Sequence, residues 1–389
     1  MIAPEPFFDS RGTPFSVYYR SKALQQLGHK IDIITYHLGK TIDIEGVTIN
    51  RIPKIPFIRN VAIGPSVMKI FLDIFLFFRA LFFLIKKNYD CIHAHEESAF
   101  LGAILKKIFG IPLTYDMHSR IPEQLINFNF FKYRPIIKLA NIAEKWIIEN
   151  SDVVITICQY LEDSVHKIDP NTKAIKIENI PLPLNYNSIS TEEKINRLKE
   201  RFGIENNKII LYTGTLVPYQ GLSLLLESIP HVKKMHRDVK FVIVGGEPKN
   251  ILKLKDLSAR LNIEDSVIFT GKQPIESIAA LMAMADVLTS PRIIGTNVPM
   301  KIYTYLRSGK PIVATNITAN TQVLSEKIAI LTEANEKSFA KGLIRLLDDK
   351  DLGEKLGMEG KKFVEAQYTY SKFLSSTKQV YDHIARIKG

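Results

Sequence analysis

The segment Ser290–Thr315 holds the residues of this chain that most clearly suggest chemistry. Its sequence is SPRIIGTNVPMKIYTYLRSGKPIVAT, so a polar loop with one glycine precedes a helical stretch, and Gly309-Lys310-Pro311 then leads into an apolar strand. Pro299 is typical of the residue at which a helix starts. The backbone N–H groups from Met300 onward would then be free, and the positive end of the helix dipole favours phosphate. The segment therefore predicts a corner that binds a phosphorylated ligand.

Two cations lie close to this corner in the sequence. Arg292 stands in the loop and Lys301 in the first turn of the helix, and both could neutralise phosphate. The alternatives are a structural ion pair for Arg292 and a solvated surface position for Lys301. The net charge of +12 also favours an anionic partner, whether nucleotide phosphates, an acidic membrane surface or nucleic acid. We do not expect nucleic acid, because the chain has no RNA-binding aromatic motif, zinc-finger spacing or long basic run.

Three glycine turns precede this corner, each at the end of an expected strand. They are Gly214 after Lys208–Tyr212, Gly245 after Lys240–Val244 and Gly271 after Val267–Phe269. A glycine at a strand end lets a ligand approach the backbone closely. One such turn is weak evidence, but three in order before Ser290–Thr315 make a specific pattern.

Strands and helices alternate along both halves of the chain, which predicts mainly parallel, doubly wound sheets. The first half has expected strands at 30–35, 47–52, 89–94, 112–115 and 152–157, and helices at 20–27, 67–87, 98–108 and 135–150. The second half has expected strands at 208–212, 240–244, 267–269, 287–289 and 312–314, and helices at 222–231, 253–261 and 277–284. A proline-punctuated run at 179–185 separates them. We expect an α/β fold of two Rossmann-like domains, 1–180 and 181–367, facing each other across a cleft, with ligands at the carboxyl ends of the strands.

The amino terminus and the cysteines bear on where the protein works. Met1-Ile2-Ala3 precedes Pro4, which leaves a shorter first strand than the usual five or so residues. We favour translation from an upstream start over a truncated strand, and the intact mass of the native protein distinguishes the two. The opening residues lack the basic and apolar runs of a signal peptide. With Cys91 and Cys158 as the two cysteines, a reducing, cytoplasmic location is expected.

The run Ile70–Ile85 is strongly apolar and raises the question of a membrane. Asp73 and Arg79 interrupt it, and its 16 residues would span roughly 24 Å as a helix. That length is short of the ~30 Å hydrocarbon core, so we do not expect a transmembrane span. The plainer interpretation is a helix buried against a sheet, and the functional one is a helix that also lies in a membrane interface.

Titratable residues gather at two expected strand ends in the first half. His118 follows the strand at 112–115, and Glu96 and Glu97 follow the strand at 89–94. The two glutamates could bind the hydroxyls of a ligand, or they could cap the amino end of the following helix. His93 and His95 alternate along their strand, and we expect them to face opposite sides, which argues against a two-histidine metal site.

The order and spacing of the glycine turns and of the phosphate corner resemble the retaining glycosyltransferases of family 4, which have the GT-B fold. The resemblance extends over nearly the whole chain. Gly214-Thr215-Leu216 matches a G-R-L segment of that family, and Gln220-Gly221 matches a K-G pair. Val287–Thr315 matches an acidic motif with two glutamates eight positions apart, followed by an A-x-G-x-P-V-V-A run to which Ser308–Ala314 corresponds.

Four positions depart from the family pattern. Thr215 and Gln220 stand where the family has the arginine and lysine that usually neutralise the donor diphosphate. Thr296 and Thr304 replace the glutamates that usually contact the transferred sugar and the ribose hydroxyls. A hydrogen bond to a charged group contributes roughly 1.5–3 kcal/mol, so these losses matter. Because all four replacements can still form hydrogen bonds, we favour a divergent subgroup with a rearranged donor site over a decayed domain.

The resemblance also implies roles for residues outside the phosphate corner. The pair Gly271-Lys272 lies where the family recognises the nucleotide base, largely through backbone and shape. The loop with Arg11 and Gly12 matches one that lies under the donor phosphate and helps admit the acceptor. His118 resembles the histidine that lines the reaction centre and would position donor or acceptor by hydrogen bonding. The C-terminal helix at 368–389 is expected to pack back on the first domain.

The function implied is transfer of a sugar from a nucleotide-sugar donor, such as a UDP- or GDP-sugar, to a glycan or lipid-linked acceptor with retention of anomeric configuration. Cell-surface polysaccharide or glycolipid synthesis, in the cytoplasm or at the inner face of an anionic membrane, is the expected setting. Family 4 enzymes are generally metal-independent, so neither a metal nor a cofactor is expected. The alternatives are a catalytically silent GT-B scaffold or partner protein, and a sugar-nucleotide epimerase, which would need catalytic carboxylates in the cleft.

Overall fold

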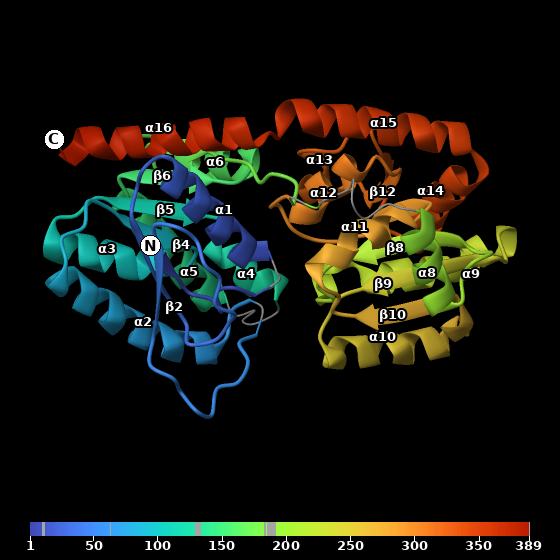
Figure 1. The fold of residues 1–389 in the computed structure, drawn as a ribbon, viewed down its shortest axis with the longest axis horizontal. Helices are drawn as coiled ribbons and strands as arrows, with labels where there is room; N and C mark the ends of the chain where they lie inside the picture. The colour runs from blue at the N-terminus through green and yellow to red at the C-terminus, as the bar shows by residue number, and fades with distance from the viewer. Residues whose placement is uncertain (10–11, 63, 129–133, 183, 185–191, 389) are drawn as a thin grey trace. The chain divides into compact units, whose positions relative to one another are not determined.

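A computed structural model describes residues 1–9, 12–62, 64–128, 134–182, 184 and 192–388. It divides into two compact units, Met1–Asn179 with Tyr370–Gly389, and Ile180–Thr369. Each unit has a parallel sheet with helices packed on it, which confirms the predicted pair of Rossmann-like α/β domains (Figure 1).

The first unit is built on a seven-stranded sheet with the order β3-β2-β1-β4-β5-β6-β7. The strands are β1 (Ile2–Ala3), β2 (Ile31–Thr35), β3 (Val47–Arg51), β4 (Ile92–His95), β5 (Leu113–Met117), β6 (Val153–Thr156) and β7 (Ala174–Lys176). β4, β5 and β6 are buried along their whole length, as expected of parallel strands covered on both faces. The two residues of β1 pair with both β2 and β4 at the centre of the sheet.

Seven described helices surround this sheet. They are α1 (Gly12–Gln26), α2 (Val67–Lys86), α3 (Ser98–Phe109), α4 (Ile121–Asn127), α5 (Arg134–Glu149), α6 (Gln159–Ile168) and α16 (Tyr370–Lys388). The last of them packs against α1, β6 and β7, and it buries Phe373 and Val380 there. The final segment of the chain is thus part of the first unit (Figure 1).

The second unit has a six-stranded parallel sheet with the order β10-β9-β8-β11-β12-β13. The strands are β8 (Lys208–Thr213), β9 (Val239–Val244), β10 (Val267–Gly271), β11 (Val287–Ser290), β12 (Ile312–Thr315) and β13 (Ile330–Thr332). The helices are α8 (Glu192–Phe202), α9 (Leu222–Met235), α10 (Pro248–Arg260), α11 (Ile275–Ala283), α12 (Met300–Ser308), α13 (Thr318–Thr321), α14 (Glu336–Asp348) and α15 (Lys350–Gln367), with short 3₁₀ turns at Pro218–Gln220 and Glu264–Ser266. Its core gathers side chains of β8, β9, α9 and α14.

The structure extends the predicted elements at several points. α1 begins at Gly12, eight residues before the helix expected from the sequence, so Gly12 lies in a helix and not in a loop. β7 and β13 were not expected, because three residues each are too few to show a periodic pattern. α12 begins at Met300, the residue from which the sequence predicted free N–H groups.

Candidate active site

The strand order of the second sheet changes direction between β8 and β11, and the loops that leave these strands carry most of the predicted donor residues. Gly214, Thr215 and Gln220 follow β8, while Arg292, Thr296 and the first turns of α12 follow β11. Ligands of open parallel sheets bind at such a switch point, beyond the carboxyl ends of the strands. Tertiary structure therefore places the two segments next to each other, with Gly214 near Lys301 and Gly221 near Pro291.

Lys301 is the central residue of this corner. Its Nζ atom lies 3.7 Å from the centre of the Tyr212 ring, and it would be 3.2 Å from a Cβ atom built on Gly214. Among the described residues this buried Nζ has no hydrogen-bond partner. Burial lowers the pKa of Lys301 well below its usual value, and the positive charge of Arg292 lowers it further. An ammonium group without a counter-ion is costly to bury, so this position is suited to an anionic ligand.

Gly214 leaves the space that such a ligand needs. Its φ of 142° lies in a region that side-chain-bearing residues rarely adopt, and it is exposed at the end of β8. The backbone therefore meets the Lys301 ammonium without a side chain between them. Met300 is half-buried at the amino end of the same helix, where its free N–H group adds to the positive field.

Arg292 has a role in shaping the loop. It is 3% exposed and donates from Nε to the carbonyl of Ile294 at 2.8 Å, from Nη1 to the carbonyl of Asn297 at 2.9 Å, and from Nη2 to the side-chain oxygen of Asn297 at 2.8 Å. Its guanidinium also lies 5.0 Å from the centre of the Tyr219 ring. The sequence analysis offered a structural ion pair as the alternative role of Arg292. The structure gives Arg292 a structural role through hydrogen bonds to its own loop. Direct contact between Arg292 and phosphate stays a prediction.

Local hydrogen bonds hold three of the neutral residues that replace charged family residues, namely Thr215, Gln220 and Thr304. The Tyr212 hydroxyl donates to the carbonyl of Thr215 at 2.7 Å and approaches Oε1 of buried Gln220 at 3.3 Å. The side-chain oxygen of Thr304, which is 3% exposed, accepts a hydrogen bond from the N–H of Leu182 at 3.3 Å. These contacts give the side chains of Gln220 and Thr304 and the backbone of Thr215 a structural partner, and contacts of all three residues with the donor stay predictions.

The remaining donor candidates lie at the edges of the corner or outside the described residues. Thr296 is half-buried, and its carbonyl accepts a hydrogen bond from the Gln322 amide. Gly271 ends β10, and exposed Lys272 forms an ion pair with Glu247 at 2.7 Å. Arg11 is outside the described residues, and Gly12 is exposed in the first turn of α1 with open space around it.

Gly221 shows how tightly the two loops of the donor corner pack. It has a φ of 74°, and a Cβ atom there would lie 1.8 Å from the carbonyl oxygen of Pro291. Gly203 has a similar φ of 63° but nothing within 4 Å. We expect Gly203→Ala to cost about 1–2 kcal/mol of backbone strain. Gly221→Ala should cost a further 1–3 kcal/mol or so of overpacking and weaken nucleotide binding. Thermal unfolding and UDP titration measure both, and equal effects at the two sites would contradict this packing.

The acceptor candidates of the first unit follow β4 and β5, and the strand order of this sheet changes direction between β1 and β4. Oε2 of Glu96 accepts a hydrogen bond from the Gln124 amide at 2.8 Å, and the Ser119 hydroxyl donates to the same oxygen at 3.3 Å. Glu97 forms an ion pair with Lys69 at 2.8 Å. Glu96 adopts a φ of 49°, which is uncommon for a non-glycine residue and marks a constrained position.

His118 is buried beside these carboxylates. Its Nε2 atom lies 3.1 Å from Oδ1 of Asp116. Burial alone would lower the pKa of His118, but the carboxylates of Asp116 and Glu96 outweigh burial and raise it. Burial in turn raises the pKa of Glu96 to about 7, although the His118 charge opposes this. The charge states of Glu96 and His118 are therefore coupled.

The raised pKa of Glu96 predicts a pH-dependent stability. A carboxyl group whose pKa rises from 4.5 to about 7 on folding stabilises the fold fully below pH 4.5, and this contribution is lost as the pH rises through 7. We expect Glu96→Gln to reduce the decline of unfolding free energy over this interval by about 1–2 kcal/mol, allowing for screening by water. Urea unfolding at pH 5 and pH 8 tests this, and equal declines in both proteins would contradict it.

His93 and His95 face the same side of β4, which corrects the prediction that they face opposite sides. Successive side chains of a strand alternate, so residues two apart share a face. The Nε2 atoms of the two rings lie 3.1 Å apart, and Nε2 of His93 lies 3.2 Å from Oδ2 of Asp116. Nε of Arg20 donates to the same oxygen at 3.1 Å, and the Tyr381 hydroxyl lies 2.5 Å from Nδ1 of His93. Buried polar groups of β4, β5, α1 and α16 thus form one network.

Three members of this network could in principle hold a metal ion. His93, His95 and Asp116 each offer a ligand atom, and these atoms lie within 4.8 Å of one another. The Arg20 guanidinium already forms an ion pair with Oδ2 of Asp116, the oxygen that both histidines approach. A divalent cation at this position would therefore be strongly repelled by Arg20. Burial lowers the pKa of both His93 and His95, which favours their neutral forms. A neutral ring can donate one hydrogen bond and accept another, so the two rings can form a hydrogen-bonded series that ends at the Tyr381 hydroxyl. The arrangement fits a hydrogen-bond network better than a metal centre.

A chelator should therefore leave the activity unchanged. We expect donor hydrolysis or sugar transfer to stay within twofold after dialysis against EDTA, because the charge of Asp116 is balanced by Arg20. The measurement is the rate before and after dialysis, followed by added Zn²⁺ or Mg²⁺. A loss that is restored by one of these ions would show that metal independence is wrong.

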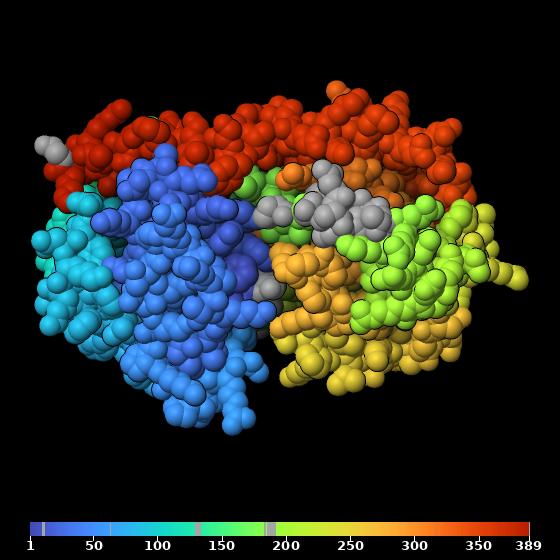
Figure 2. All heavy atoms as spheres, viewed as in Figure 1, coloured from blue at the N-terminus to red at the C-terminus, as the bar shows by residue number. Residues whose placement is uncertain are grey.

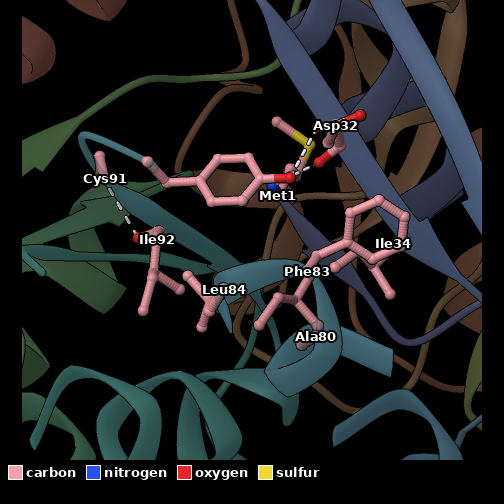
Figure 3. A pocket seen from close by; sticks show the side chains of 10 residues that line it. Met1, Asp32, Ile34, Ala80, Phe83, Leu84, Cys91 and Ile92 are labelled. Carbon is pink, nitrogen blue, oxygen red and sulfur yellow. Dashed lines mark hydrogen bonds between the residues drawn. The ribbon is translucent and has the colours of Figure 1, made fainter. Parts of the chain in front are cut away.

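A small cavity lies at the opposite end of the first sheet (Figure 3). It holds about 30 Å³ and is lined by Met1, Ile34, Phe83 and other residues near the amino ends of β1, β2 and β4. The Tyr89 hydroxyl donates to Asp32 at 2.6 Å beside it. This volume suits one or two water molecules, and the amino ends of parallel strands are not where substrates bind.

Sequence reasoning missed several residues that shape these sites. Asp116 had a readable signal, because it is a carboxylate inside the apolar strand β5. Tyr212 and Tyr305 had none, since buried tyrosines are common in cores. Tyr305 accepts the N–H of Thr213 at 2.7 Å on its hydroxyl and so fixes the end of β8. Arg20 and Tyr381 come from distant helices that only packing brings to the sheet.

Comparisons with known proteins agree with this architecture. The family described as Glycosyltransferase Family 4 matches residues 11–185, and the one described as Glycosyl transferases group 1 matches residues 194–363. An uncharacterised glycosyltransferase of Methanocaldococcus jannaschii is 26% identical over 95% of this chain and 93% of its own. The phosphatidyl-myo-inositol mannosyltransferase of Mycobacterium leprae is 25% identical over 78% of this chain and 75% of its own. HepE of Anabaena, solved with UDP and glucose, superposes with a TM-score of 0.77 at 16% identity, covering 98% of both chains.

The two sheets, the switch-point loops and these matches define a glycosyltransferase of the GT-B fold. Within that class the chain matches the family 4 and group 1 models over two regions, which together leave out little besides the linker and the C-terminal helix.

Proposed function

We propose that this glycosyltransferase transfers a sugar from a nucleotide-sugar donor to a glycan or lipid-linked acceptor with retention of anomeric configuration. The observation that carries the proposal is the buried ammonium of Lys301 beside Gly214, at the switch point of the second sheet, which has no hydrogen-bond partner in the part of the chain that the structure describes. HepE, which shares the fold, was solved with UDP and glucose, which supports a nucleotide donor of the same kind.

The donor diphosphate would be held by Lys301 and by the N–H groups at the start of α12. These groups need little reorganisation, because the Lys301 side chain and the amino end of the helix are already positioned beside Gly214. The diphosphate develops negative charge as the glycosidic bond breaks, so a fixed cation stabilises the transition state more than the bound substrate. Thr296 and Thr304 would take over the sugar and ribose contacts of the missing glutamates.

The first unit would bind the acceptor. His118 would orient the donor sugar or the acceptor hydroxyl by hydrogen bonding, and Glu96 with Glu97 would bind acceptor hydroxyls. A retaining front-face reaction needs no protein nucleophile, and the departing diphosphate can take the acceptor proton. The role of His118 is thus positioning, and the Asp116 contact at 3.1 Å fixes its ring.

The setting proposed is cell-surface polysaccharide or glycolipid synthesis at the inner face of a membrane. The mycobacterial relative is named for a lipid acceptor, which supports this class. No described helix is both long and apolar enough to cross a bilayer. Membrane contact would therefore be peripheral.

Hydrolysis of UDP- and GDP-sugars without added acceptor tests the proposal. We expect turnover with at least one donor, and a loss of 100-fold or more in His118→Ala at unchanged nucleotide affinity. Binding of nucleotide without any turnover would favour a silent scaffold. Release of an epimerised sugar nucleotide would favour an epimerase. The anomeric configuration of the first sugar released, followed by NMR, separates retention from inversion.

A further inference from the structure

Helix α2 exposes an apolar stripe along its whole length. The stripe consists of Val67, Met68, Ile70, Phe71, Ile74, Phe78, Phe82 and Ile85, whose exposed fractions range from 40% to 68%. Their spacing of three and four residues keeps most of them on one side of the helix. The atoms of this part of the chain form part of the surface of the first unit, in blue to cyan in Figure 2. Large apolar patches of this kind mark interaction sites on soluble domains.

The stripe is not needed to hold the helix on its domain. Leu72, Leu76, Ala80 and Phe83 are buried on the opposite side, where α2 packs against β2 and α3. Tyr36 donates from its hydroxyl to Asp73 at 2.6 Å, which fixes the helix further. The helix is therefore apolar on both sides, and only one of them serves the core.

Two neighbouring helices continue the exposed apolar surface. α3 contacts α2, and α5 contacts α3. Phe100 and Ile108 of α3 are 43% and 58% exposed, and Leu139 and Ile142 of α5 are 64% and 57% exposed. We call the stripe together with these four residues the apolar face.

The charges around the apolar face are mostly positive. Lys86, Lys107 and Lys138 are exposed, and the first two lie over the rings of Phe82 and Trp146. α3 contains no acidic residue, and the single acid of α2 is Asp73, which Tyr36 covers. On α5, Glu144 pairs with Arg120 and Glu149 with Lys145. The surface thus combines apolar side chains with lysines that lack an acidic counterpart on the same helices.

We infer that the apolar face docks on the surface of an anionic lipid bilayer, with α2 lying along the interface. The 20 residues of α2 make a rod of roughly 30 Å, and no described helix could span a membrane, so the helix would rest in the plane of the headgroups. The aromatic and aliphatic side chains enter the acyl boundary while the lysines reach anionic headgroups.

A second copy of the chain is a poorer occupant. A twofold contact would bring the same lysines of both copies together, and like charges across an interface oppose association. An anionic bilayer neutralises those lysines instead. Charge complementarity therefore favours lipid over self-association.

The position of α2 connects this surface with the acceptor side. Lys69 in the first turn of α2 pairs with Glu97 at 2.8 Å, next to Glu96 at the end of β4. If the proposed transfer is correct, a bilayer-bound α2 holds the acceptor residues close to the headgroups. This consequence, which rests on the proposed function, favours an acceptor whose sugar is carried on a membrane lipid.

Vesicle flotation of the full chain tests the lipid surface. We expect binding to phosphatidylcholine vesicles with 30 mol% or so of phosphatidylglycerol and at least fivefold less to phosphatidylcholine alone. The triple variant Ile74→Ser/Phe78→Ser/Phe82→Ser should lose at least tenfold in binding. Leu252→Ser on α10, 61% exposed in the second unit, is the matched control and should stay within twofold of the native chain.

Three outcomes would overturn the inference. They are no flotation of the native chain, unchanged flotation of the triple variant, and a native dimer in sedimentation that the triple variant converts to monomer. Donor hydrolysis without vesicles should be equal in both proteins, because the three side chains contact neither candidate site. A failure of hydrolysis in both would count against the proposed transfer alone, since lipid binding does not depend on it.

Discussion

Replacing Lys301 with alanine should weaken the binding of UDP or GDP by tenfold or more. A charge-assisted hydrogen bond contributes roughly 1.5–3 kcal/mol, and each 1.4 kcal/mol or so is tenfold in affinity. Among the described residues the buried ammonium of Lys301 has no hydrogen-bond partner, and it lies beside exposed Gly214, so its hydrogen bonds are available to the ligand. Isothermal titration with both nucleotides measures the loss.

The affinity should also depend on pH through the same residue. Burial lowers the pKa of Lys301 in the free site, and the charge of a bound diphosphate would raise it again by favouring the ammonium form. Binding therefore takes up a proton and weakens as the pH rises. Titrations in buffers of different ionisation enthalpy detect this uptake, which Lys301→Met should abolish.

Lys272→Ala is the control for both measurements. Lys272 is exposed and paired with Glu247, so its removal should change affinity by less than threefold. Unchanged UDP and GDP affinities in Lys301→Ala, or equal proton uptake in native protein and Lys301→Met, would show that the phosphates bind elsewhere.

Replacing Asp116 with leucine should lower the unfolding free energy of the first unit by about 3–5 kcal/mol. Its carboxylate lies 3.1 Å from Arg20, 3.2 Å from His93 and 3.1 Å from His118, and it is fully buried. Without it the buried guanidinium of Arg20 has lost its counter-ion, and that charge cannot be removed by deprotonation. Urea unfolding followed by the fluorescence of Trp146, the single tryptophan of the chain, reports on this unit.

The pH dependence of this contribution follows from the direction of the pKa shift. Burial would raise the pKa of Asp116, but Arg20 and the neighbouring histidines outweigh burial and hold it well below the usual value. A depressed carboxyl pKa stabilises the fold above the unfolded value, near 3.8, and the stabilisation is lost as the pH falls through the folded pKa. The effect of Asp116→Leu should therefore be fully present at neutral pH.

The double variant Arg20→Met/Asp116→Leu provides the control. Removing both charges replaces the pair with apolar side chains of similar size, which is often close to neutral in stability. We expect the double variant to be more stable than Asp116→Leu alone, with a coupling of 1 kcal/mol or more. Additive losses would show that Arg20 and Asp116 do not stabilise each other.

The local elements of the donor corner could be predicted because short-range patterns specify them. Alternating apolar runs gave the strands, glycines marked their ends, and Pro299 with the following residues gave the start of α12 at Met300. The prediction that His93 and His95 face opposite sides of β4 was wrong, although the sequence held the necessary information. Side chains two residues apart in a strand lie on the same face. The partners of Asp116 could not be predicted, since Arg20 is 96 residues away in the chain and Tyr381 is 288 residues from His93.

The sequence by itself determined the order of strands and helices, the turns at the strand ends and the start of α12 after the loop that follows β11. These follow from backbone preferences and hydrophobic periodicity, which act over a few residues. Tertiary structure alone decided that Lys301 is buried against Tyr212, that Arg292 holds its own loop, and that Asp116 joins Arg20 to three histidines. Burial and partner choice depend on which distant segments pack together, and they set the charge and pKa of each group.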